Sequence, residues 1–110
     1  MSSRISTLAK AVKDHPDDSF YKFTLALEML KIDETAKARV LFEAIENSDP
    51  EYVGVYYHLA KLYVELGENK KALETYKKGI EVAEEQGDNH TKSELSGALL
   101  NLEIEMEDES

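Results

Sequence analysis

Apolar side chains recur three or four residues apart along nearly the whole chain, which is the spacing of one helix face. Proline disfavours the helical conformation of the residue before it, so Pro16 and Pro50 mark two helix ends. Asp17 or Asp18 is suited to cap the next helix, and Gly67 to end a later one in the left-handed conformation. The pattern predicts an all-α chain of about six helices. We expect them at roughly residues 3–14, 18–31, 34–47, 51–66, 68–86 and 89–106.

The two prolines lie 34 residues apart, which is a recognised repeat period. Comparing the chain with itself at that offset places small residues on small ones and aromatic or large residues on aromatic ones. The matched pairs are Leu25 with Leu59, Ala26 with Ala60, Met29 with Tyr63, Ala38 with Ala72, and Phe42 with Tyr76. Small residues let helix backbones approach closely, and large ones fill the space between them. The sequence therefore predicts two copies of one helical unit.

These positions resemble the signature of the tetratricopeptide repeat (TPR) family. The residues that carry the resemblance are Leu25, Ala26, Ala38, Phe42, Pro50, Leu59, Ala60, Tyr63, Ala72 and Tyr76. The resemblance implies a short right-handed α-solenoid of antiparallel helix-turn-helix repeats, of the small stand-alone bacterial type. As a single domain of residues 1–110 it would comprise a half repeat at 1–16, repeats at 17–50 and 51–87, a capping helix at 88–106 and an acidic frayed tail at 107–110.

The last helix has its own apolar stripe. Gly87 ends the preceding helix, and the stripe after it follows the helical spacing i, i+3, i+4, i+7 and i+11. Its members are Leu95, Ala98, Leu99, Leu102 and Met106. Repeat arrays need a terminal element that covers the last apolar face and turns a polar one to water. We expect this helix to fill that role.

The charge and the absence of cysteine narrow the function. The 110 residues carry 13 basic and 23 acidic side chains, a formal net charge of −10, and no cysteine. Disulfides and thiolate metal sites are impossible. Binding to phosphate backbones needs clustered Lys and Arg, so nucleic acid is not an expected partner. No apolar stretch is long enough to span a membrane, and the expected location is cytoplasmic.

No arrangement of residues predicts catalysis, a metal or a cofactor. The chain has three histidines, none of them in a two-histidine metal motif. His90 and Glu94 lie four residues apart, but two ligands fall short of a site. No glycine-rich loop precedes a helix, and the many carboxylates are expected on solvated faces. The protein is therefore predicted not to be an enzyme.

The resemblance implies a binding groove lined by the first helix of each repeat. Its expected contacts with a peptide or protein partner are Phe20, Phe23, Leu27, Tyr57, His58 and Lys61. The apolar residues would anchor the ligand and Lys61 would supply a charge contact. One subclass of the family grips a C-terminal carboxylate with lysine, asparagine and arginine. The matching positions here hold Phe23, Leu27 and His58, so that clamp is missing.

Three alternatives stand beside the groove. Phe20, Phe23 and Leu27 could instead pack against neighbouring side chains of their own unit. If they are exposed, the same apolar strip could drive homodimerisation or assembly, since exposed apolar patches often mark interfaces. The acidic surface could also dock a basic partner, with binding that weakens steeply with salt.

Overall fold

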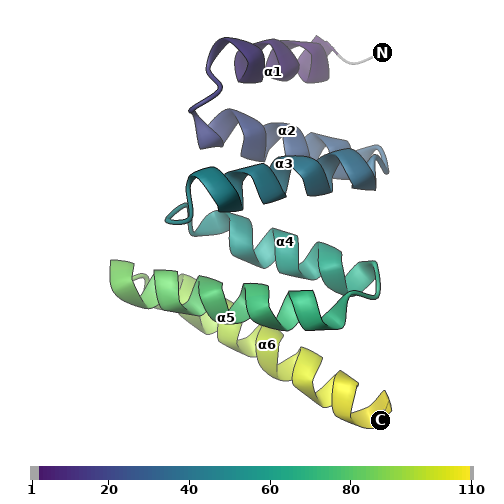
Figure 1. Cartoon of the computed structure of the whole chain (residues 1–110), viewed down its shortest axis with the longest axis vertical. Helices are drawn as coiled ribbons and strands as arrows, with labels where there is room; N and C mark the ends of the chain where they lie inside the picture. The colour runs from purple at the N-terminus through teal and green to yellow at the C-terminus, as the bar shows by residue number, and fades with distance from the viewer. Residues whose placement is uncertain (1–2, 110) are drawn as a thin grey trace. The chain divides into compact units, whose positions relative to one another are not determined.

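The protein is described here by a computed structural model that covers residues 3–109 (Figure 1). Every regular element in that range is a helix. The helices are α1 (Ser3–Asp14), α2 (Ser19–Lys31), α3 (Thr35–Ser48), α4 (Gly54–Glu65), α5 (Asn69–Gln86) and α6 (Asn89–Glu109). The predicted all-α class of helix-turn-helix repeats is confirmed.

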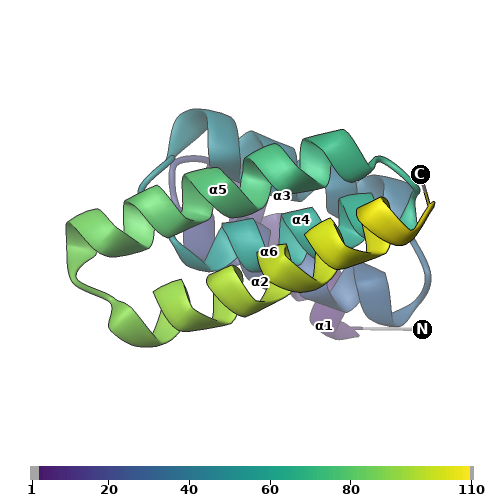
Figure 2. The ribbon, with the colours of Figure 1, turned by 90° about the horizontal axis from the view of Figure 1, so that it is seen from below.

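The helices form two compact units that divide after Tyr52. The first unit contains α1, α2 and α3, and the second contains α4, α5 and α6. Within each unit a helix packs on its neighbour in sequence. In the second unit α5 and α6 run side by side over much of their length (Figure 2).

Three helices end in the same hydrogen-bonded turn. After α2, Asp33 adopts the left-handed conformation with φ 60°, and the Glu34 N–H donates to the Met29 carbonyl at 2.9 Å. The equivalent bond after α4, 34 residues later, is 2.8 Å long, and Gly67 takes the left-handed position. Gly87 ends α5 in the same way. The bond reaching back over the last turn satisfies helix carbonyls that would otherwise lack a donor.

Aspartate side chains begin two of the helices. Asp18 accepts a hydrogen bond from the Phe20 N–H at 3.0 Å, so it is the cap that the sequence predicted for α2. Asp88 accepts bonds from the Thr91 hydroxyl at 2.7 Å and the Thr91 N–H at 3.1 Å. Both bonds lower the pKa of Asp88, and the bond from the hydroxyl makes the larger contribution. Both carboxylates satisfy a donor of the first helical turn.

The cores contain the repeat positions that the sequence identified. The buried apolar residues of the first unit are Leu25, Ala26, Ala38, Phe42 and Ile45. Those of the second unit are Val55, Tyr56, Leu59, Ala60, Leu62, Tyr63, Ala72, Tyr76, Val82, Ala83, Leu95 and Leu102. Pro50 is the exception among the signature residues, because it lies exposed in the turn after α3. Its role is therefore to shape that turn.

Two predicted boundaries were wrong. α4 begins at Gly54 and not at residue 51, because the chain first makes a turn in which the Tyr52 N–H donates to the Asp49 carbonyl at 3.0 Å. α6 continues to Glu109 instead of ending at residue 106. Glutamate is a good helix former, and no glycine or proline interrupts this stretch. Residues 107–109 are thus helical and do not form the frayed tail that we expected, while Ser110 lies outside the described residues.

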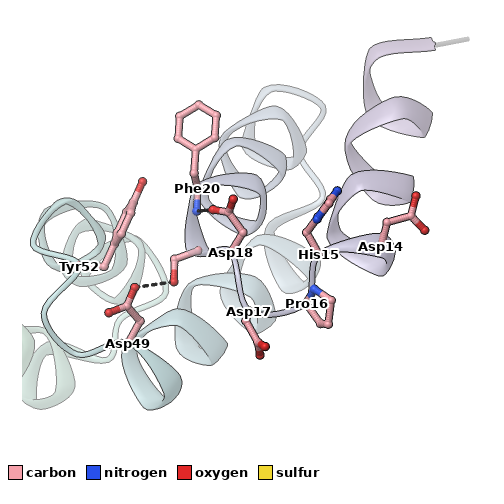
Figure 3. A pocket seen from close by; sticks show the side chains of 9 residues that line it. Asp14, His15, Pro16, Asp17, Asp18, Phe20, Asp49 and Tyr52 are labelled. Atoms are coloured by element: carbon pink, nitrogen blue, oxygen red, sulfur yellow. Dashed lines mark hydrogen bonds between the residues drawn. The ribbon is translucent and has the colours of Figure 1, made fainter.

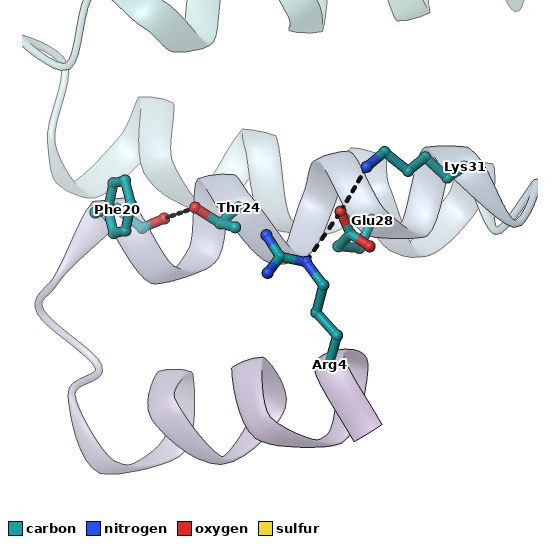
Figure 4. A network of polar contacts seen from close by, with 5 residues as sticks. All are labelled: Arg4, Phe20, Thr24, Glu28 and Lys31. Atoms are coloured by element: carbon teal, nitrogen blue, oxygen red, sulfur yellow. Dashed lines mark hydrogen bonds and ion pairs between the residues drawn. The ribbon is translucent and has the colours of Figure 1, made fainter. Parts of the chain in front are cut away.

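A polar contact joins α1 to α2. Glu28 of α2 accepts a hydrogen bond from the Lys31 ammonium at 2.9 Å and pairs with the Arg4 guanidinium of α1 at 3.4 Å (Figure 4). Both contacts lower the pKa of the Glu28 carboxyl, and the hydrogen bond from Lys31 makes the larger contribution. The contact between these two helices therefore includes a charged pair as well as apolar packing.

Candidate functional site

The second unit has an open hollow of about 270 Å³ between α4 and α6. Its lining is more apolar than polar, and it includes Tyr57 and Lys61 from the predicted groove. The complete lining is Tyr57, Lys61, Val64, Glu65, Tyr76, Ala98, Asn101, Leu102 and Glu105. The hollow exists because α4 and α6 both pack on α5 and contact each other only sparsely.

Tyr76 of α5 contributes to this hollow from the helix behind it. Its side chain is almost wholly buried, and this burial raises the pKa of its phenol, with smaller contributions from Tyr57 and Glu105. The phenol therefore stays neutral and can donate or accept a hydrogen bond. Two tyrosines thus give the hollow an amphipathic wall, which is suited to an apolar side chain with a polar end.

His58 lies beside the hollow and is half-buried. Its ring meets that of Tyr57 edge to face, with 5.6 Å between centroids. Burial lowers the pKa of His58, Lys61 lowers it further, and Glu94 of α6 partly opposes the change. His58 is therefore neutral at pH 7, and the positive charge at this edge of α4 comes from the exposed Lys61.

The three groove residues predicted in the first unit differ in exposure. Phe23 is half-buried, and its ring lies 5.4 Å from Tyr52 and 6.0 Å from Phe42, centroid to centroid. Leu27 is also half-buried, whereas Phe20 is 58% exposed. Internal packing thus accounts for much of Phe23, and Phe20 offers the largest free apolar surface of the three.

The first unit also has an acidic hollow of about 610 Å³ that the sequence reasoning missed (Figure 3). It is lined by Asp14, His15, Pro16, Asp17, Asp18, Ser19, Phe20, Asp49 and Tyr52. Two of its four carboxylates hold the fold. Asp18 caps α2, and Asp49 accepts a hydrogen bond at 2.7 Å from the hydroxyl of the buried Ser19. The available signal was that aspartates flank both prolines, which mark turns that the repeat brings to one end of the unit.

The described residues contain no group of three or more side chains suited to a metal ion. His90 and Glu94 do approach each other, at 3.8 Å, but they make a two-residue pair on the surface. Within residues 3–109, no helix is both long and apolar enough to cross a membrane.

Comparison with known proteins identifies the repeat. The sequence profile described as Tetratricopeptide repeat matches residues 29–89, which is more than half of the chain. A stretch of 70 residues is 33% identical to serine/threonine-protein phosphatase T of Trypanosoma brucei brucei. That match covers 64% of this chain and only 15% of the phosphatase.

Solved structures agree with the profile. The tetratricopeptide repeat domain protein of Salinibacter ruber is 48% identical, with a TM-score of 0.77 over 80% of this chain and 89% of that one. The TPR2B domain of yeast Sti1, solved in a complex with pHsp70, has a TM-score of 0.84 at 18% identity and covers 92% of this chain and 81% of that one. The secretion translocator chaperone SycD of Yersinia enterocolitica has a TM-score of 0.85 at 13% identity, over 94% and 72% of the two chains. The last two show the shared fold. The profile match and the Salinibacter relative show that the chain belongs to the tetratricopeptide repeat family.

Proposed function

We propose that the protein is a non-catalytic interaction module that binds a peptide or protein segment in the hollow between α4 and α6. The observation that carries this proposal is the hollow itself, with apolar walls and a few polar groups at its rim. Its volume of about 270 Å³ lies below the roughly 300–1,000 Å³ of small-molecule sites, and suits one large side chain of a longer ligand. The family fold supports a role as a protein-interaction scaffold.

The ligand side chain that enters the hollow is apolar or aromatic. Tyr57 and Leu102 provide apolar surface, and the amide of the exposed Asn101 is available to the ligand backbone. Lys61 favours an acidic group next to the anchor, whereas Glu65 and Glu105 of the same lining favour a basic one. The pHsp70 complex of the Sti1 domain supports segment binding by this fold in general, although its low identity transfers no ligand.

A peptide selection on the full chain tests this proposal. Random peptides displayed on phage are selected against the immobilised protein, and the enriched sequences are titrated by amide shifts. We expect shifts in α4 and α6, and roughly tenfold weaker binding of the enriched peptides to Lys61→Glu. Lys77→Glu, an exposed change on α5 outside the hollow, is the matched control and should leave binding intact. Shifts confined to α3 and α5, or equal loss in the control, would contradict the proposal.

The sequence suggested homo-oligomerisation as the alternative function. The exposed Phe20 is the observation that keeps it in consideration. Sedimentation over a range of concentrations separates the two, because a monomer at high concentration does not use Phe20 for assembly. The cytoplasmic location expected from the sequence stays a prediction.

A further inference from the structure

α6 presents apolar residues on two opposite faces. Leu95 and Leu102 are buried toward the rest of the second unit. Leu100 and Ile104 are 57% and 50% exposed and lie one turn apart. At about 100° per residue they stand on the side of the helix away from the buried pair. A terminal helix that only capped the repeats would be polar on this side.

The outer face of α6, which we define by Gly97, Leu100 and Ile104, is open to a partner. A Cβ added to Gly97 would have no atom within 4 Å, apart from those of its chain neighbours and the nearby backbone of α6 itself. A second helix could therefore approach the backbone closely there and pack on the two aliphatic side chains that follow. Leu100 and Ile104 together give this face a short apolar strip that a partner helix could cover.

Acidic side chains border this outer face on both sides. The helical spacing puts Glu103 and Glu107 along one border and Glu105 and Asp108 along the other, and all four are exposed. Lys92 is the only lysine or arginine after residue 78, and it pairs with Glu84 of α5 at 2.7 Å. The carboxylates next to Leu100 and Ile104 therefore create a field that favours cations.

We propose that the outer face of α6 docks an amphipathic helix of a partner protein whose apolar stripe is flanked by lysine or arginine. Such a helix covers Leu100 and Ile104 and places its cations against the bordering carboxylates. A second copy of this chain would instead bring two acidic helices together, and an anionic membrane surface would be repelled. The charge pattern selects the basic helix among these occupants.

This surface is separate from the hollow between α4 and α6. The hollow uses Ala98, Asn101, Leu102 and Glu105 of α6. Glu105 also borders the outer face, but Gly97, Leu100 and Ile104 do not line the hollow. Substitutions at Leu100 and Ile104 therefore test this surface without changing a residue that lines the hollow.

Synthetic peptides supply the probe for the test. One 18-residue peptide of leucine and lysine carries leucine at amphipathic helical spacing, and a second has the same composition in scrambled order. Binding to the full chain is followed by fluorescence anisotropy at low and high salt. We expect the amphipathic peptide to bind at least tenfold more tightly than the scrambled one, with affinity that falls as salt rises.

Three variants locate the contact. Leu100→Gln with Ile104→Gln should weaken binding of the amphipathic peptide at least tenfold, while circular dichroism shows the helix content retained. Val40→Gln, which changes a 65% exposed apolar residue on α3, and Lys61→Glu, in the hollow, should each leave binding unchanged. Equal affinity for the scrambled peptide, or loss caused by Lys61→Glu, overturns the proposal. So does a wild-type dimer in sedimentation that the double variant abolishes.

Discussion

The two units differ in where they place the large and the small residue at one equivalent contact between two helices. In α3 the position 34 residues before Gly79 holds Ile45, which is fully buried. In α5 a Cβ on Gly79 would lie 2.5 Å from the Tyr56 Cβ, a distance that side chains do not adopt. The corresponding partner in α2 is Lys22, which is only half-buried. A large residue on one helix therefore requires a small one on the other, and the two repeats place the large one on different helices.

The units also differ in how much apolar surface they bury. Among the described residues, five apolar side chains are buried in the first unit and twelve in the second. α1 contributes none of the five, and a polar contact from Arg4 to Glu28 helps to hold it. Since burial of apolar area is the main stabilising contribution, the second unit is the stronger core of the two.

Removing the large residue of the first unit should have the largest effect. Ile45→Ala leaves a cavity at a fully buried site and is expected to lower the free energy of unfolding by about 2–5 kcal/mol. Thermal and urea unfolding followed by circular dichroism measures the loss. Val40→Ala, at an exposed position of the same helix, is the control, and an equal loss there would contradict the cavity explanation.

Adding one carbon to the second unit should be the next largest effect. Gly79→Ala forces α4 and α5 apart and is expected to lower the free energy of unfolding by about 1–3 kcal/mol. Gly97→Ala makes the same change in α6, where the space is open, and should stabilise the protein by about 0.5–1 kcal/mol because alanine favours helix. If Gly79→Ala also stabilised the protein, helix propensity, and not the contact with Tyr56, would decide the outcome.

The left-handed turns give a smaller contrast between the units. Asp33 has φ 60° where the second unit has Gly67 with φ 77°. Asp33→Gly relieves the left-handed strain and should raise the free energy of unfolding by about 0.5–1 kcal/mol. The reverse change, Gly67→Asp, should lower it by a similar amount. Equal melting temperatures for the wild type and both variants would exclude strain at this turn.

The smallest expected effect is a dependence of stability on pH in the second unit. Burial lowers the pKa of His58 below its ordinary value of 6.5. As the pH falls through 6.5, the unfolded chain takes up a proton before the folded protein does, so this contribution to stability is lost below that pH. His58→Gln should flatten the slope of stability against pH between 7 and about 5. His90→Gln, at a side chain that is 86% exposed, should retain it, and a slope unchanged in His58→Gln would contradict the assignment.

Only part of the candidate site followed from the sequence: of the nine residues that line the hollow, Tyr57 and Lys61 were among the expected groove residues. The resemblance to the repeat family implied both as groove positions, on the helix that became α4. The sequence did not predict Asn101 and Glu105 there, because the packing of α4 and α6 on α5 decides which side chains of α6 face the hollow. The sequence also predicted the same role for Phe20 and Phe23. In the structure Phe23 packs on Tyr52 and Phe42, whereas Phe20 is exposed.

The sequence by itself determined the local features of the protein: six helices, the repeat period, the small and large core positions, and the turns at Gly67 and Gly87. These depend on helical spacing and backbone preferences within a few residues. Only the tertiary structure decided which groups meet across helices. It brought the aspartates beside Pro16 together with Asp49 and put Tyr76 behind the hollow. It also left Leu100 and Ile104 uncovered, because exposure depends on the packing of neighbouring helices and not on the apolar pattern of one helix.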